Sequence, residues 1–226
     1  AAAARGGSVR MPRKNVAPFL GKPLIHWTIR AAIDSGMVDR VIVSTDDPEI
    51  AEASRAAGAE VPFLRPAHLA TSTAATFDVV DHAITALALT QPTYVLMQPT
   101  SPLRDAADLR TAFALFHDRK AAAVVSVAPF DKPWPVLRRT DGAGVMQTVD
   151  EPASGLPTLL LNGAIYIGHV ATLRATRSFT PPGTLPFLMP AERSVDIDTP
   201  LDFQIAETVG RSMVQGASID RIGAGC

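Results

Sequence analysis

The sequence predicts an α/β fold in which helices cover both faces of a mostly parallel sheet. Strand-like and helix-like segments alternate along the chain with short connections, which is typical of parallel sheets. The expected strands are continuous apolar runs of four to six residues, as found in strands that are buried on both faces. With 226 residues, 47% of them hydrophobic, the chain can bury a sizeable single core.

Local signals mark the ends of the first elements. An alanine-rich segment at 1–4 is expected as the first strand, although polyalanine is a poor strand former. An amphipathic helix is expected over 23–35, ended by Gly36. The Asp46-Asp47-Pro48 run is expected to cap a second helix that Gly58 closes. The other expected elements are strands at 40–45, 60–64, 94–98, 122–127 and 164–167, helices at 49–57, 76–89, 105–119 and 200–214, and a loose tail at 216–226.

The alternation stops between 129 and 158, a stretch rich in proline and glycine. A structureless loop of about 30 residues is uncommon in a compact domain. We therefore expect an inserted arm at 129–158 within one domain of 1–226, and expect the arm to pair with a second subunit. The parallel pattern is expected to resume at 164–167.

Composition excludes several classes of protein. The chain has 21 basic and 22 acidic residues and a net charge of −1, which argues against a general nucleic-acid binder. No apolar run is long enough to span a membrane. The single cysteine, Cys226, excludes a disulfide scaffold. No signal peptide is visible, so we expect a soluble cytoplasmic protein with neither nucleic-acid nor membrane partners.

A glycine-rich basic loop follows the first expected strand, from Arg5 to Asn15. Glycines let backbone N–H groups approach an anion, and basic side chains can neutralise a triphosphate. The loop is neither a Walker A loop nor a G-x-G-x-x-G fingerprint. A solvated basic loop is the alternative.

Asp196 and Asp198 are two residues apart, so in an extended segment their carboxylates face the same side. Two such carboxylates can hold Mg²⁺ (or Mn²⁺) together with substrate phosphates. The alternative is a capping cluster in which Asp198 or Thr199 starts the helix at Pro200. Both interpretations can hold at once.

Polar residues also follow the expected strand at 94–98. The segment Gln98-Pro99-Thr100-Ser101-Pro102-Leu103-Arg104 lies at the strand's carboxyl end, where open α/β sheets bind ligands. The alternative is a turn and cap for the helix near Asp105. Asn162 begins a short turn into the strand at 164–167 and is a further candidate.

Together these segments resemble one family, the acylneuraminate cytidylyltransferases: the CMP-sialic acid synthetases and bacterial relatives acting on legionaminic or pseudaminic acid. The match spans about residues 4–210 and its blocks occur in the family's order. The blocks are 5–8 with 12–15 and 21–24, then 43–47, 63–66, 98–104, 162–166 and 194–199.

The resemblance implies a Rossmann-like nucleotidyltransferase (nucleotide-diphospho-sugar transferase) fold with a dimerisation arm. It implies that CTP is joined to the anomeric hydroxyl of a nine-carbon keto sugar acid, giving a CMP-sugar and pyrophosphate, with Mg²⁺ or Mn²⁺ as cofactor and a homodimer as the assembly.

The resemblance also implies roles for individual residues. Asn15 and Arg65 are expected near the cytosine, and Asp196 and Asp198 are expected to hold the metal. Either aspartate could accept the hydroxyl proton, directly or through a water on the metal. The residues expected on the triphosphate are Arg5 (also catalytic), Gly6, Gly7, Ser8, Arg10 and Lys14. Those expected on the sugar are Gln98, Thr100, Ser101 and Asn162.

Three positions depart from the family pattern. Val9 stands where the family has lysine, Leu160 where an arginine often precedes the asparagine, and Ser72 where an aspartate is usual. These changes leave open another acceptor, such as a 3-deoxy-octulosonate or a phosphonate, or a degenerate member that binds nucleotide with little turnover.

Overall fold

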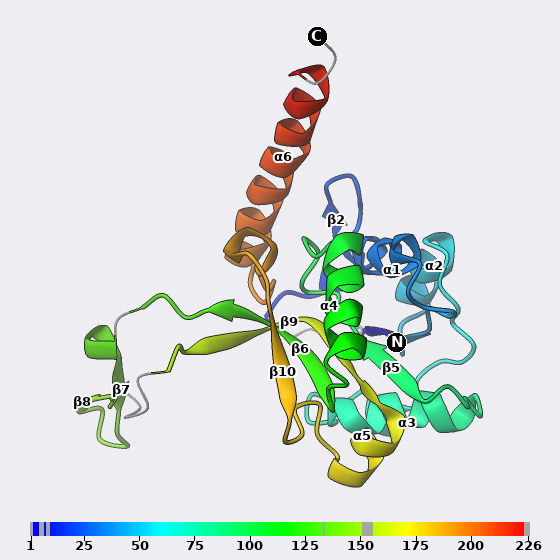
Figure 1. The fold of residues 1–226 in the computed structure, drawn as a ribbon, viewed down its shortest axis with the longest axis horizontal. Helices are drawn as coiled ribbons and strands as arrows, with labels where there is room; N and C mark the ends of the chain where they lie inside the picture. The colour runs from blue at the N-terminus through cyan, green and yellow to red at the C-terminus, as the bar shows by residue number, and fades with distance from the viewer. Residues whose placement is uncertain (1, 5–6, 8–9, 133, 151–155, 224–226) are drawn as a thin grey trace.

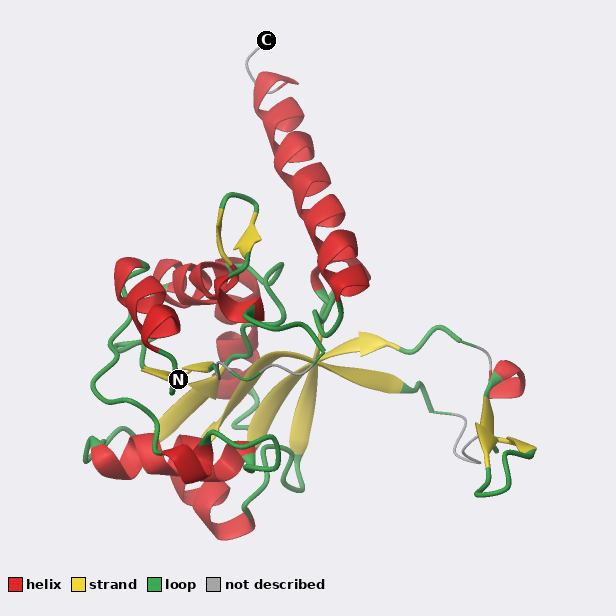
Figure 2. Ribbon diagram, turned by 180° about the vertical axis from the view of Figure 1, so that it is seen from behind, coloured by secondary structure: helices red, strands yellow, loops and turns green. Residues whose placement is uncertain are grey.

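The computed structural model describes residues 2–4, 7, 10–132, 134–150 and 156–223. Its largest sheet has the strand order β10-β6-β9-β5, and helices cover both faces (Figures 1 and 2). The strands are β5 (Thr93–Leu96), β6 (Ala123–Pro129), β9 (Leu159–His169) and β10 (Thr184–Leu188). The expected α/β class is confirmed.

One strand runs opposite to expectation. β9 pairs antiparallel with both β5 and β6, whereas β6 and β10 are parallel. The expectation that the parallel pattern resumes at 164–167 is therefore wrong. The chain returns from the arm beside the end of β6, where Pro129 pairs with Leu159, so it must run back along that strand. An apolar run marks a buried strand but does not encode its direction.

A second, short sheet lies beside β5. It pairs β1 (Ala2–Ala3) in parallel with β4 (Val43–Ser44). The expected strand at 60–64 is reduced to two parallel bridges, Ile42 to Glu60 and Thr45 to Leu64.

The helices form two layers. On one face, α1 (Leu24–Ser35) and α4 (Ala106–Asp118) bury a cluster against Val95, Val124 and Ile165. On the other, α3 (Thr76–Ala86) and α5 (Val170–Thr176) pack on Leu96 and Tyr166. Figure 2 shows these layers above and below the sheet.

Capping residues place the helix ends as expected. The Asp47 side chain accepts from the N–H groups of Glu49 and Ile50 at 2.8 and 3.1 Å, so α2 spans Pro48–Ala56. Asp105 and Asp108 form a capping box at the start of α4.

The final helix, α6, spans Pro200–Gly223 and is longer than expected, since it includes most of the segment expected to be a loose tail. It rises from the body, with its base packed in the cluster of Phe19, Leu24 and Ile197 (Figure 1). The described residues also form elements that were not expected from the sequence: the hairpin of β2 (Pro18–Phe19) and β3 (Lys22–Pro23), the helix α5, the strand β10 and four short 3-10 helices. The 3-10 helices are Lys14–Val16, Ala67–Leu69, Trp134–Val136 and Ala191–Arg193.

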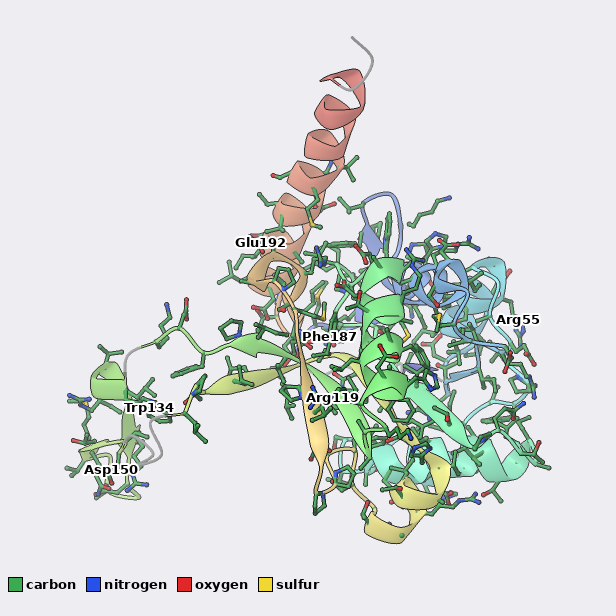
Figure 3. The ribbon with its side chains drawn as sticks, in the orientation of Figure 1. Arg55, Arg119, Trp134, Asp150, Phe187 and Glu192 are labelled. Atoms are coloured by element: carbon green, nitrogen blue, oxygen red, sulfur yellow. The ribbon has the colours of Figure 1, made fainter. Side chains whose placement is uncertain are left out.

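The segment between β6 and β9 projects from the body as an arm, with a hairpin of β7 (Arg138–Thr140) and β8 (Met146–Thr148) at its end. Figure 3 shows Trp134 and Asp150 on this arm, far from the helices of the body. The segment expected as an arm therefore contains regular secondary structure. Its role in dimerisation stays a prediction.

Candidate active site

A cavity of about 370 Å³ lies where β4 and β5 end. This is the carboxyl edge of the strands, the usual ligand site of open α/β sheets. It is lined by Arg10, Lys14, Asn15, Arg65, Leu69, Thr71, Ser72, Ala74, Thr76, Val79, Leu96, Gln98, Pro99, Thr100 and Asp198. Segments distant in the sequence thus meet at one site.

The basic loop meets the aspartate segment at this cavity. The Lys14 side chain is buried, and its Nζ donates to the carbonyl of Ile197 at 2.6 Å and to Asp198 Oδ1 at 3.2 Å. Arg10 reaches the other oxygen of Asp198 at 2.5 Å. The structure thus brings Arg10 and Lys14 of the basic loop into direct contact with Asp198. The ion pairs also hold the positively charged side chains of Arg10 and Lys14 beside the cavity. An anionic ligand in the cavity could compete with Asp198 for these two side chains.

Arg65 and Asn15 form a buried wall of the same cavity. Arg65 is anchored to the ends of two strands: its Nε donates to Ser44 Oγ at 3.1 Å, and its Nη2 donates to the carbonyls of Ala4, at 3.3 Å, and of Ser44. A guanidinium held in this way keeps a fixed position in the cavity wall.

Asp196 lies next to the cavity and is bonded to Thr100, which lines it. Although its side chain keeps exposed surface, the surrounding protein desolvates the carboxyl and raises its pKa. The charge of Asp198 adds to this increase in pKa, whereas the Thr100 hydrogen bond and Lys14 oppose it. A bound cation would therefore stabilise the ionised forms of these two carboxylates.

The capping interpretation of the same segment also holds. Asp202 Oδ2 accepts from the N–H of Thr199 at 2.7 Å, and Thr199 Oγ1 accepts from the N–H of Asp202 at 3.2 Å. This box starts α6. The hydrogen bond that the Thr199 hydroxyl donates to the Asp202 carboxylate, together with those from the N–H groups of Thr199 and Asp198, lowers the pKa of Asp202.

The four expected sugar residues separate into two layers. Gln98 and Thr100 line the cavity. Ser101 and Asn162 are buried behind it and bonded to protein: Ser101 Oγ donates to the carbonyl of Asn162 at 2.9 Å, and Asn162 Nδ2 donates to Ser194 Oγ at 3.0 Å. The side chains of Ser101 and Asn162 are therefore placed to support the cavity wall from behind.

Four positions of the glycine-rich loop, Arg5, Gly6, Ser8 and Val9, lie outside the described residues. Gly7 is exposed and is not in the cavity wall. Of the other departures from the family pattern, Ser72 lines the cavity, while Leu160 lies on the arm stem with half of its surface exposed.

Two buried or half-buried arginines support the site without having been expected to do so. Arg104 is buried, and its guanidinium donates to the carbonyls of Gln98 at 2.6 Å and Ala164 at 2.9 Å. Burial lowers its pKa to about 9, with Asp108 opposing the shift. Arg193, just ahead of the aspartate segment, pairs with buried Asp108 at 2.9 Å. Arg104 was part of a recognised block, but nothing in the sequence signals a pair 85 positions apart.

The donor set fits a hard divalent cation shared with a substrate. Among the described residues no group of three or more His, Cys, Asp or Glu side chains forms a complete metal cage. Two aspartates beside a cavity lined by Arg10, Lys14 and Arg65 suit Mg²⁺, which commonly binds one or two carboxylates plus substrate phosphates. The part of the chain that the structure describes has no helix long and apolar enough to cross a membrane.

The fold, with its cavity at the carboxyl edge of the strands, is a nucleotidyltransferase fold. It matches that of CMP:2-keto-3-deoxy-manno-octonic acid synthetase in complex with CTP, with a TM-score of 0.68 and 18% identity over 94% of this chain and 97% of that one. It also matches 4-diphosphocytidyl-2C-methyl-D-erythritol synthase from Anaerococcus prevotii, with a TM-score of 0.62 and 11% identity over 93% and 97%.

The chain belongs to the cytidylyltransferase family, whose model matches residues 3–141. It is 36% identical to CMP-N,N'-diacetyllegionaminic acid synthase of Legionella pneumophila, over 90% of this chain and 92% of that protein. It is 34% identical to N-acylneuraminate cytidylyltransferase of Escherichia coli, over 91% of this chain and 50% of that one. It is 32% identical to pseudaminic acid cytidylyltransferase of Campylobacter jejuni, over 90% and 92%. The resemblance found in the sequence is confirmed.

Proposed function

We propose that this enzyme joins CTP to a nonulosonic acid and releases pyrophosphate, with a CMP-sugar as the product. The observation that carries the proposal is the meeting of Arg10 and Lys14 with Asp198 at one cavity, in a chain 36% identical to a CMP-N,N'-diacetyllegionaminic acid synthase. Basic groups for a triphosphate and carboxylates for a metal are what such a transfer needs.

Positioning and charge neutralisation supply most of the catalysis in such a reaction. Arg10 and Lys14 exchange Asp198 for phosphate oxygens when CTP binds, and Arg5, Gly6, Gly7 and Ser8 complete that loop. Asn15 and Arg65 hold the cytosine. Gln98 and Thr100 orient the sugar acid, and Ser101 and Asn162 support them from behind. The sugar hydroxyl attacks the α-phosphorus in line, and pyrophosphate leaves.

We assign Mg²⁺ (or Mn²⁺) to Asp196 and Asp198. When bound, it supplies charge neutralisation at the phosphates. Because Asp198 is held by Arg10 and Lys14, we assign the role of proton acceptor to Asp196. The sugar hydroxyl loses its proton to a carboxylate oxygen of Asp196.

We also infer a homodimer formed through the arm. Its described residues expose an unusual share of large apolar side chains for surface segments. These are Val136, Val145, Met146, Leu156, Leu159, Leu160 and Leu161.

The proposal is tested by measuring pyrophosphate release with each of the four nucleoside triphosphates. The acceptors are N-acetylneuraminic, legionaminic and pseudaminic acids, with a 3-deoxy-octulosonate and a phosphonate as comparisons. We expect release with CTP, a divalent cation and a nonulosonic acid, and none after chelation. If pyrophosphate is released only with the 3-deoxy-octulosonate or the phosphonate, that compound replaces the nonulosonic acid as the proposed acceptor.

Calorimetry with CTP separates the remaining alternative. CTP binding without product from any acceptor would indicate a degenerate member. In that case Val9→Lys is the first variant to examine, and a gain in turnover would identify the missing lysine as the defect.

A further inference from the structure

Arg104 lies behind the wall of the active-site cavity, and its guanidinium meets three separate elements. Nε donates to the carbonyl of Ala164 on β9 at 2.9 Å, and Nη2 donates to the carbonyl of Gln98, just after β5, at 2.6 Å. On α1, Thr28 Oγ1 accepts from Nη1 and from Nη2, both at 3.2 Å. Arg104 is only 2% exposed, so protein oxygens rather than solvent satisfy its donors.

These contacts lie where the regular pairing of β5 with β9 stops. The last paired residues are Leu96 and Tyr166. Two steps further, the same register would place Gln98 opposite Ala164, but the N–H of Gln98 donates to the carbonyl of Gly163 instead, at 3.2 Å. The guanidinium therefore joins the carbonyls of two residues that the strand pairing leaves out of register.

The end of this pairing also decides where the side-chain amide of Gln98 lies. Gln98 lines the active-site cavity, and a Cβ at Gly163 would lie 2.6 Å from its Oε1. Arg104 holds the backbone on both sides of this close approach, at Gln98 itself and at Ala164, the residue after Gly163. A shift of either strand end would therefore move the Gln98 amide relative to the cavity.

The buried charge of Arg104 has no carboxylate in contact with it. Among the described residues its guanidinium forms no salt bridge, and the nearby Asp108 is paired with Arg193 at 2.9 Å. Burial lowers the pKa of Arg104 to about 9, with the charge of Asp108 opposing that shift. Carbonyl and hydroxyl oxygens alone surround the cation, and a planar guanidinium is the side chain whose forked donors reach several such acceptors at once.

We propose that Arg104 is a positioning residue for the acceptor of the reaction. By joining the carbonyls of Gln98 and Ala164, it fixes the Gln98 amide at the cavity wall, where that amide orients the sugar acid. This inference rests on the proposed function, which gives Gln98 its role.

The groups that we assign to the nucleotide are held by other contacts. Arg65 is bonded to Ser44, and Lys14 is bonded to the carbonyl of Ile197. Neither contact runs through Arg104. A change at Arg104 should therefore weaken the use of the acceptor while CTP binding is kept.

The experiment compares three variants of this cluster with a matched control. Arg104→Lys keeps the charge but loses the forked donors, and Arg104→Met removes both. Thr28→Val keeps the shape of the side chain and removes only the acceptor on α1. Arg110→Met is the control, because Arg110 is an exposed arginine of α4 that donates to the carbonyl of Asp34 at 3.3 Å.

We expect Arg104→Lys to raise KM for the sugar acid at least about tenfold, while the calorimetric Kd for CTP changes less than about twofold. Arg104→Met should raise KM at least as much, and Thr28→Val should raise it less, since both carbonyl bonds remain. Arg110→Met should leave both constants unchanged. An unchanged KM in Arg104→Lys, or a Kd for CTP that rises as much as KM, would overturn the proposal. If Arg104→Met does not fold, Arg104→Lys and Thr28→Val still decide the question.

Hydrogen exchange at the Gln98 amide tests the positioning without any substrate. We expect this amide to exchange at least about tenfold faster in Arg104→Lys than in Arg110→Met, because its bond to Gly163 lies beside the lost contacts. Equal exchange in the two variants would reject the inference. If the unaltered protein releases no pyrophosphate with any acceptor, the proposed function fails, and the exchange rates still decide whether Arg104 positions Gln98.

Discussion

Asp196 and Asp198 are two residues apart, yet the protein surrounds them differently. Asp198 neutralises Arg10 and Lys14, whereas Asp196 is desolvated and lies in the field of Asp198. The Asp198 carboxylate therefore stabilises the ligand-free protein. The Asp196 carboxylate destabilises it, and a bound cation would offset that loss of stability. Such strain is typical of functional sites.

The first prediction contrasts the two aspartates. Asp196→Asn removes a disfavoured charge, so we expect Tm of the ligand-free protein at neutral pH to rise, while turnover falls at least about 100-fold. Asp198→Asn removes the partner of buried Lys14 and should lower Tm. Thermal unfolding without nucleotide or metal, together with pyrophosphate release, checks both. A lower Tm for Asp196→Asn would contradict the assigned environment.

The same pair predicts a pH dependence with a definite sign. Because the native pKa of Asp196 is raised above its ordinary value of 3.8, the native state binds more protons than the unfolded state between those two values. The contribution of Asp196 to stability therefore falls as pH rises through that window. Urea unfolding at several pH values should show the advantage of Asp196→Asn growing with pH above about 4 and then levelling off.

Gly163 gives a third prediction at the residue scale. Its φ is +73°, and a Cβ there would lie 2.6 Å from Gln98 Oε1. Gly163→Ala should cost about 1–3 kcal/mol and displace Gln98, raising KM for the sugar acid. Gly144→Ala is the matched control, since its φ is +79° with nothing within 4 Å. Equal effects on KM would show that Gln98 does not orient the acceptor.

At the scale of elements, the segment carrying the two aspartates is held by its neighbours. Arg193 ties it to Asp108 at the start of α4, and the N–H of Ile197 donates to the carbonyl of Thr100 at 2.8 Å. The Thr199 cap then fixes the start of α6. The geometry of the aspartates thus depends on two helix starts and the loop after β5.

Breaking the Arg193–Asp108 pair should therefore affect both stability and metal use. The Asp108 side chain is 3% exposed, so Arg193→Met leaves a buried carboxylate without its salt-bridge partner and should cost about 3 kcal/mol. We also expect a higher Mg²⁺ concentration for half-maximal turnover. Arg211→Met, at an exposed pair with Glu207, is the matched control and should cost at most about 0.5 kcal/mol. Unfolding curves and metal titrations measure the two effects, and an unchanged metal requirement would refute the positioning role.

At the scale of the whole molecule, the arm and α6 project from the body (Figure 1). All of the residues that line the active-site cavity belong to the body. The arm is held to the body by the pairing of β6 with β9, which extends to Pro129 and Leu159. An antiparallel stem of this kind can present a small hairpin at a distance without a core of its own. Its exposed apolar side chains are the reason to expect a partner copy.

The arm prediction uses Met146, which is 68% exposed on β8. Met146→Glu places a charge in the expected interface and should shift the protein toward monomer in sedimentation experiments. Met146→Leu keeps an apolar side chain and should leave the assembly unchanged. The far-UV spectrum should be the same for all three proteins. An unaltered dimer in Met146→Glu would place the interface elsewhere on the molecule.

The sequence by itself determined the fold class, most helix boundaries and the family. Apolar runs and local caps such as Asp47 and Asp105 act over a few residues, and that short range is why they can be recognised without coordinates. Tertiary structure decided what depends on contacts distant in the sequence. Such contacts set the antiparallel direction of β9, pair Asp198 with Arg10 and Lys14, and place Ser101 and Asn162 behind the wall rather than in it. Strand direction, desolvation and exposure are set by neighbours that a local pattern does not specify.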